Sequence, residues 1–360
     1  MEKLIPFKNL NKFTVDVFKA MGCSAQDAVI AAKTLLSADL RGVDSHGVAR
    51  LSGYVRLWQN KRVNPTPRIS IVHETPSTAV VDGDAGLGLV VAPFAMQIAI
   101  EKARNAGTGW VAVKNSNHYG IAGYHAMMAL EHDMIGMSMT NASALVAPAL
   151  SKERMLGTNP IAVAIPAKYQ PPFVADFATT TASNGKLEIL QRLHKNAPLG
   201  WVQTEEGEPT THASALKEKG SMLPLGSDIE HSSHKGYILG SLVDIFSAVL
   251  SGASYGPWAP PFPAYVPMPQ NMPGEGLGHF LGAMRVDAFR PADEFKAHMD
   301  NWIERFRQAK PAPGFDKVLI PGDPERAYEK VRKAEGIPML QVVYDDLKTV
   351  ADIVGVEFEL

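Results

Sequence analysis

Cysteine is almost absent from this chain, and long hydrophobic runs are missing altogether. The single cysteine, Cys23, cannot form a disulfide within the chain, and no Cys-x-x-Cys pair offers ligands for zinc. No run of about twenty apolar residues predicts a membrane span. The opening MEKLIPFKNLNKF lacks the apolar stretch of a signal peptide. We therefore expect a protein of the reduced, cytoplasmic compartment that has no membrane partner.

An excess of charge of one sign is also missing. The chain has 35 Lys and Arg residues against 37 Asp and Glu residues, which gives a formal net charge of −2. This balance argues against a nucleic-acid-binding surface. Hydrophobic residues make up 46% of the 360 residues, which is enough for a core, and the length predicts two or three lobes.

The two ends of the chain read as helical and the middle reads as sheet. Helical spacing of apolar residues predicts a helix from Ser24 to about Leu40. We expect Ser24 to cap the start of this helix together with Asp27. We therefore expect an α/β protein with a helical lobe formed by both ends. Helices are expected at 8–20, 46–60, 90–106, 121–132, 182–195, 237–251, 291–310, 323–336 and 343–355. Strands are expected at 68–73, 78–82, 109–115, 134–140, within 159–167, at 173–177 and from 278. The proline-rich segment 252–276 should form an ordered loop.

The glycine-rich stretch VVDGDAGLGLVVA is similar in composition to a dinucleotide-binding loop, but the spacing of its glycines does not match that motif. Gly83, Gly86 and Gly88 give G-x-x-G-x-G instead of G-x-G-x-x-G, and no acidic residue ends the following strand, which closes in VKNSNH. We therefore expect a tight turn between strand and helix in which the glycines adopt positive φ. Any nucleotide must be bound by a different, non-Rossmann arrangement.

The stretch RGVDSHGVARL places a histidine where a helix should begin. If Asp44 or Ser45 caps a helix at 46–60, His46 lies in its first turn, where the positive end of the helix keeps the imidazole neutral. A neutral imidazole can act as a general base. Arg50 and Tyr54 follow at intervals of four, so all three side chains should share one face, which suits a small carboxylate-bearing substrate. The alternative is a histidine that merely completes a cap.

A second histidine follows a predicted strand in KNSNHYGIAG. Residues between the end of a strand and the start of a helix often bind ligands, so His118 is a candidate proton donor or carbonyl polariser. The alternative is a loop histidine bonded to backbone. The pair His231 and His234 in HSSH precedes its helix, and HExxH is missing, so we expect no metal site.

Two strand-to-helix or loop-to-helix junctions could hold phosphates. FVADFATTTASNGK carries three consecutive hydroxyls, and SSHKGYILG places Lys235 and Gly236 before a helix. Hydroxyl groups and free backbone N–H groups at a helix start form anion sites. Threonines also cap helices routinely, so the pattern suits a pyrophosphate without requiring one. The three hydroxyls belong to Thr179, Thr180 and Thr181.

These blocks together resemble the type-2 malate/L-lactate dehydrogenase family, which includes ureidoglycolate and L-sulfolactate dehydrogenases, 2,3-diketogulonate reductase and piperideine-2-carboxylate reductase. The resemblance lies in RGVDSHGVARL, VDGDAGLG, SNHYGIAGYHAM, TNASALVAP, LGTNPIAVAIPA, FVADFATTTASNGK and HKGYILGSLVDIFSAVLSGA. It implies a non-Rossmann, L-sulfolactate dehydrogenase-like α/β fold with a mixed central sheet, and oxidoreduction of a small 2-hydroxy or 2-oxo acid with NAD or NADP. It also implies a homodimer.

The resemblance also assigns roles to residues of this chain. His46 is expected to carry the proton, His118 to share that role or orient substrate, and Arg50, Tyr54 and Ser45 to complete the catalytic set. Cofactor contacts are expected from His118, Ser143, Asn159, Asp176, Phe177, Ala178, Thr179, Thr180, Thr181, His234, Lys235, Gly236, Gly322 and Asp323. The proline-rich 252–276 loop departs from the family pattern, which bears on the choice of substrate and coenzyme.

We expect three parts in the chain: a helical lobe at 1–75 joined by 290–360, a sheet-containing substrate domain at 76–125 and 252–289, and an NAD(P)-binding domain at 126–251. Three alternatives stay open: a cyclic imine reductase, a non-catalytic metabolite-binding protein on the same scaffold, and a metal-dependent hydrolase. The sequence does not decide between NAD and NADP.

Overall fold

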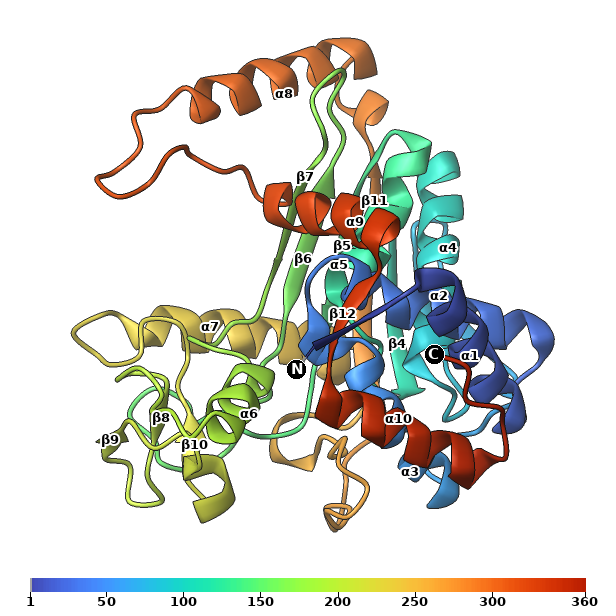
Figure 1. Cartoon of the computed structure of the whole chain (residues 1–360). Coiled ribbons are helices and arrows are strands. Elements are labelled where there is room, and N and C mark those ends of the chain that lie inside the picture. Colours follow the sequence, from blue (N-terminus) through green and yellow to red (C-terminus); the bar gives the residue numbers. More distant parts are fainter. Residues whose placement is uncertain (1) are drawn as a thin grey trace.

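A seven-stranded sheet forms the centre of the computed structural model, which describes residues 2–360 apart from the side chains of Glu2 and Arg192 (Figure 1). Among its strands, β3 and β4 run parallel and all other neighbours run antiparallel. This mixed sheet confirms the expected α/β, non-Rossmann class. Its strands, in spatial order, are β2 (Ser70–Glu74), β3 (Thr78–Asp82), β4 (Thr108–Ser116), β11 (Leu277–Arg285), β5 (Met134–Thr140), β6 (Ile161–Ile165) and β7 (Phe173–Phe177).

The βαβ unit expected around residue 90 is present. Helix α4 (Gly88–Ala106) connects the parallel strands β3 and β4 and packs on the sheet through a row of buried small side chains. Small residues allow a helix to approach a sheet closely, and Gly109 shows how closely, because a Cβ there would lie 2.0 Å from the carbonyl oxygen of Ala99. The buried alanines of α4 are Ala92, Ala95, Ala99 and Ala103.

The two ends of the chain join in one helical lobe, as expected (Figure 1). The predicted cap at Ser24 is confirmed, since its Oγ accepts the backbone N–H of Asp27 at 3.0 Å. Cys23 is buried between the first two helices, which raises the pKa of its thiol to about 12. The lobe contains α1 (Phe7–Ala20), α2 (Ala25–Leu40), α3 (Leu51–Gln59), α9 (Asp323–Glu335) and α10 (Gln341–Val354). Strands β1 (Glu2–Ile5) and β12 (Ile337–Leu340), which the sequence did not predict, pair antiparallel and tie the ends together.

The remaining elements surround the sheet. Helices α5 (Ala122–Met127), α6 (Asn184–Arg192) and α8 (Ala292–Arg307) lie near their predicted positions. Helix α7 (Ser233–Asp244) begins four residues earlier than expected and continues as a π-helical turn at Ile245–Val249. The segment 252–276 is irregular, as expected, with one short 3-10 turn. A small unpredicted sheet is formed by β8 (Val202–Gln203), β9 (Pro209–Thr210) and β10 (Ser221–Met222).

The central sheet draws its strands from all three predicted parts of the chain, since β2 lies within the 1–75 part that was expected to belong to the helical lobe. Strands β3, β4 and β11 come from 76–125 and 252–289, whereas β5, β6 and β7 come from 126–251, and β11 pairs with β5 across that division. The proposed substrate and cofactor parts therefore share one continuous sheet. The boundary between them remains a prediction.

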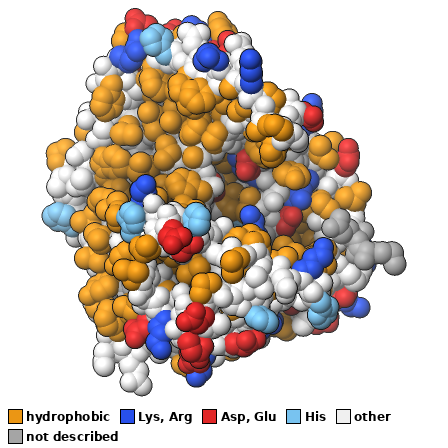
Figure 2. All heavy atoms as spheres, turned by 90° about the vertical axis from the view of Figure 1, so that its left-hand side faces the viewer, with side chains coloured by type: hydrophobic (Ala, Val, Ile, Leu, Met, Phe, Trp, Pro, Cys, Tyr) orange, Lys and Arg blue, Asp and Glu red, His pale blue; other side chains and the backbone are white. Residues whose placement is uncertain are grey.

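One face of the molecule carries a broad apolar surface. Figure 2, which views the molecule from the side where α7 lies in Figure 1, shows hydrophobic side chains gathered over much of this face. Among residues 2–360, no helix combines the length and apolar character needed to cross a bilayer. The apolar stripe consists of the exposed residues Ile238, Leu242, Ile245, Phe246, Val249 and Leu250 on α7 and its π-helical continuation.

The glycine-rich turn before α4 serves close packing, and the expectation of positive φ at its glycines is wrong. The residues with positive φ are Asp84 and Ala85, at 50° and 55°. Gly83 and Gly88 are needed for a different reason, because a Cβ at either position would collide with backbone. The Cβ would lie 2.8 Å from the carbonyl oxygen of Asn115 at Gly83 and 2.0 Å from that of Asn117 at Gly88. The glycines thus hold the 114–118 segment against the helix start.

Replacement of Gly88 by alanine should destabilise the protein, although alanine normally favours a helix. Overpacking against the Asn117 carbonyl should lower the free energy of unfolding by about 1–3 kcal/mol, measured by urea denaturation followed by circular dichroism. Gln97→Ala, an exposed change on the same helix, is the matched control and should shift stability little. Equal midpoints for Gly88→Ala and wild type would contradict the close contact.

Candidate active site

The turn that carries His46 differs from the expected helix start. Residues Asp44–His46 and Val48–Arg50 form two short 3-10 turns, and helix α3 begins only at Leu51, so the prediction of a helix at 46–60 capped by Asp44 or Ser45 is wrong at its start. The buried Asp39 carboxylate causes this break. It accepts the Val48 N–H at 2.9 Å and lies where a Cβ of residue 47 would be, 2.2 Å away. The helix dipole therefore does not set the protonation of His46.

Ser45 connects His46 to Arg50. Its Oγ lies 2.9 Å from Nδ1 of His46, and its carbonyl oxygen accepts Nε–H of Arg50 at 2.6 Å. The side chains of all three residues are partly exposed, so a small ligand can reach them. The structure thus brings His46, Arg50 and Ser45 together, as the sequence predicted, although through a turn instead of one helical face.

His118 lies next to His46, and Tyr54 and Phe262 hold its ring. The ring centroids of His46 and His118 are 5.9 Å apart with 20° between their planes. The Tyr54 hydroxyl lies 2.5 Å from Nδ1 of His118, and the backbone N–H of Gly120 also donates to this nitrogen at 3.4 Å. The Phe262 ring lies 4.7 Å from that of His118. Because Nδ1 accepts from Gly120, a neutral His118 carries its proton on Nε2.

Burial keeps both imidazoles neutral. Loss of solvation lowers the pKa of His46 to about 4, and the charge of Arg50 contributes. The pKa of His118 lies well below its usual value, first because of burial and then because of His46 and Arg50. Burial raises the pKa of Tyr54, so its phenol remains protonated at neutral pH. Both rings can therefore act as neutral groups, His46 as a proton acceptor and His118 as a donor.

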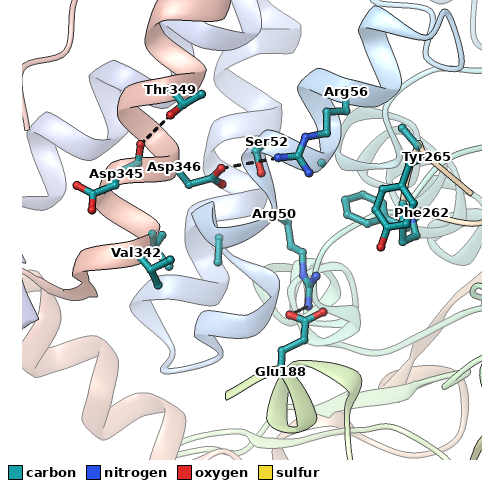
Figure 3. Close-up of a pocket in the computed structure, with 15 residues that line it drawn as sticks. Arg50, Ser52, Arg56, Glu188, Phe262, Tyr265, Val342, Asp345, Asp346 and Thr349 are labelled. Atoms are coloured by element: carbon teal, nitrogen blue, oxygen red, sulfur yellow. Dashed lines mark hydrogen bonds and ion pairs between the residues drawn. The ribbon is translucent and has the colours of Figure 1, made fainter. Parts of the chain in front are cut away.

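A pocket of about 490 Å³ opens beside Arg50 (Figure 3). Arg50 and Phe262 line both this pocket and the histidine cluster, whereas His46 and His118 do not line it. In the structure, Nη2 of Arg50 lies 3.4 Å from a carboxylate oxygen of Glu188 on α6. Arg56, on the next turns of α3, lies 3.9 Å from Asp346. Arg50 thus has a carboxylate partner at the place where a substrate carboxylate is expected.

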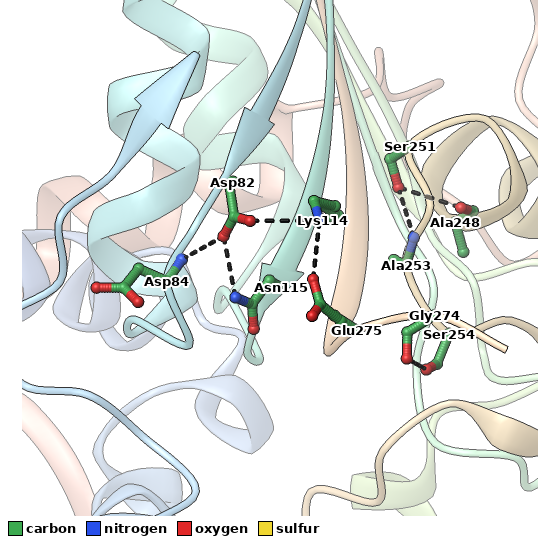
Figure 4. Close-up of polar contacts among 10 residues, drawn as sticks. All are labelled: Asp82, Asp84, Lys114, Asn115, Ala248, Ser251, Ala253, Ser254, Gly274 and Glu275. Carbon is green, nitrogen blue, oxygen red and sulfur yellow. Dashed lines mark hydrogen bonds and ion pairs between the residues drawn. The ribbon is translucent and has the colours of Figure 1, made fainter. Parts of the chain in front are cut away.

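Phe262, which lies in the proline-rich loop 252–276, packs in the site. Ser143, predicted as a cofactor contact, uses its Oγ to accept the backbone N–H of Phe262 at 2.9 Å. Gly53 on α3 leaves room for the ring, because a Cβ there would lie 2.5 Å from it. The loop is tied to the end of β4 by the ion pair of Glu275 with Lys114 at 2.8 Å, and Lys114 also lies 3.3 Å from Asp82 on β3 (Figure 4). The two ends of the loop are joined to each other by the bond from Ser254 Oγ to the Gly274 carbonyl at 2.7 Å.

The three threonines after β7 have their hydroxyls engaged within the protein. Thr179 donates to the carbonyls of Thr158 and Asn159, Thr180 donates to Ala182, and Thr181 donates to Gly200. Thr179 and Thr180 are also buried. Backbone carbonyls thus accept these hydroxyl protons in the structure. The expected anion site at Thr179, Thr180 and Thr181, and the cofactor contact from Ala178, remain predictions.

The other predicted cofactor segments gather around the end of β7. The amide nitrogen of Asn159 donates to the carbonyl of Gly240 on α7 at 2.9 Å, and a Cβ at Gly240 would touch Thr179 at 3.1 Å. His234 and Lys235 are exposed in the first turn of α7, while Gly236 packs against Leu225. The first turn of this twelve-residue helix thus offers a lysine and a histidine to solvent.

Asp176 and the turn at Gly322 lie along the same strand. The Asp176 carboxylate accepts the Gly123 N–H at 2.7 Å; although water reaches it, surrounding protein raises its pKa to about 6. Phe177 beside it is also exposed. Gly322 has a φ of 96°, and a Cβ added at this position would lie 3.1 Å from the Cβ of Val174. The carboxylate of Asp323 already binds Arg307 and Arg326, so this side chain holds the turn together.

Three site residues escaped the sequence interpretation: Phe262, Glu188 and Asp39. Of these three, only Phe262 could have been found from the sequence, because it is an aromatic residue in the 252–276 loop, which departs from the family pattern. The described residues contain no cluster of three His, Cys, Asp or Glu side chains that could hold a metal ion. Of the HSSH pair, His231 is bonded to Asp228 at 2.8 Å.

The comparisons with known proteins identify the family. Residues 5–348 match the family described as malate/L-lactate dehydrogenase. The chain belongs to this family. It is similar to a malate dehydrogenase of Pyrococcus abyssi, with 44% identity over 98% of this chain and 95% of the relative. It is also 38% identical to an L-sulfolactate dehydrogenase of Methanocaldococcus jannaschii, over 98% of this chain and 97% of that protein.

A solved structure supports the fold over the whole chain. The crystal structure of a malate dehydrogenase from Entamoeba histolytica superposes with a TM-score of 0.92 at 32% identity and covers 100% of both chains. The structure of L-sulfolactate dehydrogenase from M. jannaschii gives a TM-score of 0.88 at 35% identity and covers 99% of this chain and 98% of that chain. These matches confirm the expected L-sulfolactate dehydrogenase-like fold.

The His46 imidazole should stay neutral far below its usual pKa. Titration of histidine ring signals by NMR, with His46 assigned through His46→Gln, should give a midpoint near the value of about 4. Arg50→Met should raise this pKa, because removal of a neighbouring cation stabilises the imidazolium. Arg56→Met removes an equal charge from α3, six residues farther along the chain, and is the control that should leave the midpoint in place. A midpoint near 6.5 in the wild type would contradict the burial of the ring.

Proposed function

We propose that this protein is an NAD(P)-dependent oxidoreductase that interconverts a small 2-hydroxy acid and the corresponding 2-oxo acid. The observation that carries this proposal is the cluster of two neutral imidazoles beside one arginine whose present partner is a carboxylate. The membership in the malate/L-lactate dehydrogenase family and the malate and sulfolactate dehydrogenases among its relatives support the same reaction.

The proposed roles follow from the geometry of the cluster. Arg50 grips the substrate carboxylate through two hydrogen bonds after the carboxylate displaces Glu188. His46 accepts the proton of the C2 hydroxyl as the hydride leaves C2, and a bond from Nδ1–H to Ser45 Oγ leaves its Nε2 free for this step. His118 donates from Nε2 to the same oxygen, and Tyr54 holds that tautomer. In the reverse direction, a protonated His46 returns the proton to the oxo group.

The nicotinamide coenzyme accepts or supplies the hydride when bound. The exposed Lys235 and His234 in the first turn of α7 fit a pyrophosphate, because the helix start and the lysine both favour an anion. Asp176 offers an accessible carboxylate to ribose hydroxyls, and Phe177 offers an apolar surface. The choice between NAD and NADP remains for experiment. The proposed compartment is the cytoplasm, which suits a chain whose one cysteine is a buried thiol.

A coenzyme-linked absorbance assay tests the proposed reaction. The purified protein is screened with NADH and NADPH against oxaloacetate, pyruvate, 3-sulfopyruvate and a cyclic imine such as piperideine-2-carboxylate. We expect turnover with at least one 2-oxo acid. Turnover with the imine alone would replace the proposed substrate class. No turnover with any of them, despite coenzyme binding, would favour a metabolite-binding protein, and coenzyme-free activity lost on chelation would favour a metal-dependent hydrolase.

His46→Ala should lower kcat by at least about 100-fold, because general acid–base catalysis contributes factors of that size. Coenzyme binding, measured by the fluorescence of NADH or NADPH, should remain at the wild-type level. His73→Ala, which removes an exposed histidine on β2, is the matched control and should retain wild-type turnover. Normal turnover of the His46 variant would remove this residue from the mechanism.

We also propose a homodimer that buries the apolar stripe on α7. Six large apolar side chains on one exposed helical face are unusual for a monomer, and such faces typically form protein interfaces. The expected occupant is a second copy of this chain, as the family resemblance implies.

Leu242→Asp should disrupt this dimer. Light scattering coupled to size exclusion should give about twice the chain mass of 38.9 kDa for the wild type and a value that approaches the single-chain mass for the variant. Val29→Asp places the same charge on an exposed apolar residue of α2, on the other side of the molecule, and should leave the dimer intact. A monomeric wild type would contradict the proposal.

A further inference from the structure

Arg332 at the C-terminal end of α9 inserts a buried guanidinium beneath the turn that carries His46. Its side chain is only 8% exposed. Nη1 donates to the backbone carbonyl of Asp39 and to one carboxylate oxygen of Asp44, and Nη2 donates to the other oxygen at 3.1 Å. The Asp44 pair joins residues 288 positions apart in sequence. A bidentate arginine–carboxylate contact fixes both distance and orientation.

The rest of α9 supports this contact. Glu329, one turn before Arg332, lies 3.3 Å from the largely buried guanidinium of Arg41. The ring of Tyr328 lies 5.3 Å from the guanidinium of Arg332 and packs against Gly42, where a Cβ would be 2.6 Å from the ring. This face of α9 therefore contacts the chain at 39–44 through several independent interactions.

These contacts lead directly to the catalytic side chains. Asp44 is the first residue of the 3-10 turn that continues through Ser45 to His46. Ser45 Oγ bonds the His46 ring, and the Ser45 carbonyl bonds Arg50. A shift of Asp44 must therefore move the proton acceptor and the substrate-binding cation together.

The turn that carries His46 is also held on its other side, at Val48. The backbone carbonyl of Asp39 accepts a hydrogen bond from Arg332, and the carboxylate of the same residue accepts the Val48 N–H. The three residues between the attachment points Asp44 and Val48, which include Ser45 and His46, are thus held at both ends. A short segment fixed in this way keeps its side chains within the narrow tolerance that catalysis needs.

We propose that Arg332 is a positioning residue of the active site, which sets the placement of His46 and Arg50 through Asp44. The inference rests on the proposed roles of these two residues. Without the guanidinium, Asp44 and the Asp39 carbonyl lose a shared donor, the turn loosens, and the partly exposed His46 ring becomes more solvated. A purely structural role would lower thermal stability and leave the protonation of His46 unchanged.

The test compares Arg332→Met, Arg332→Lys and Asp44→Asn with the control Lys330→Met, which removes an exposed charge from the same helix. We expect kcat to fall about 10- to 100-fold in Arg332→Met and Asp44→Asn, because a misplacement of about 1 Å has effects of this size. Coenzyme affinity should be unchanged. Arg332→Lys should retain more activity than Arg332→Met, and Lys330→Met should behave as wild type.

The protonation of His46 distinguishes positioning from stability. Arg50 and His118 face the His46 ring and are unaltered in these variants. The substitutions themselves each remove one charge: loss of the Arg332 cation favours the imidazolium, whereas loss of the Asp44 carboxylate disfavours it. Asp44→Asn is therefore the decisive variant, and in it the NMR midpoint of His46 and the acid limb of kcat/KM for 2-hydroxy acid oxidation should both rise from about 4 toward 6.5, against the effect of the lost charge. The NMR titration needs no substrate. It therefore tests the Arg332–Asp44 contact even if the coenzyme-linked assay finds no activity. The absence of activity would refute only the proposed function.

Two results would overturn the inference. Unchanged kcat and an unchanged His46 midpoint in both Arg332→Met and Asp44→Asn would show that the turn does not depend on the pair. A lower melting temperature with both quantities unchanged would assign the pair to stability alone. If Arg332→Met does not fold, Asp44→Asn decides, because Asp44 is 53% exposed and its replacement leaves Arg332 in place.

Discussion

Neutrality of two adjacent imidazoles beside a guanidinium is the constraint around which this site is arranged. A cation near His46 and His118 makes protonation of either ring unfavourable, and burial strengthens that effect because water cannot screen it. Burial alone would leave polar ring nitrogens without partners, which is costly. The hydroxyls of Ser45 and Tyr54 supply a partner to Nδ1 of each ring, which leaves Nε2 of each ring available to a ligand.

This arrangement draws on distant parts of the chain. The bond between Tyr54 and His118 joins residues 64 positions apart, and the bond that seats Phe262 joins positions 119 apart. The parallel unit β3–α4–β4 brings the first pair together, since β4 ends at Ser116 just before His118. The 252–276 loop, held at the sheet edge, closes the cluster with an aromatic ring. The mixed sheet thus serves as the common support for three separate segments.

The sequence could predict this site only where a local pattern carried the information. Helical spacing and strand-like runs gave most elements, and the motifs around His46 and His118 identified both imidazoles. The predicted helix start at residue 46 was wrong because the buried carboxylate of Asp39, nine positions before Val48 in the sequence, accepts the Val48 N–H. The β1–β12 pairing and the roles of Phe262 and Glu188 depend on contacts between distant residues, which leave no periodic signal in one sequence. The threonine hydroxyls match an anion site in composition, and the structure adds that they are bonded to backbone carbonyls, which one sequence does not reveal.

The contact between Arg50 and Glu188 follows from the same electrostatic constraint. A partly buried guanidinium without a counter-ion would be unfavourable, so Arg50 needs a carboxylate partner within the protein. Glu188 on α6 supplies it at 3.4 Å, and Asn184 holds the other Glu188 oxygen at 2.9 Å. Because the pair is long and partly exposed, its strength is small. Under the proposed function, a substrate carboxylate with two parallel hydrogen bonds to Arg50 would displace Glu188. Substrate affinity would then reflect a competition between two carboxylates for one cation, in which the position of α6 sets the strength of the internal competitor.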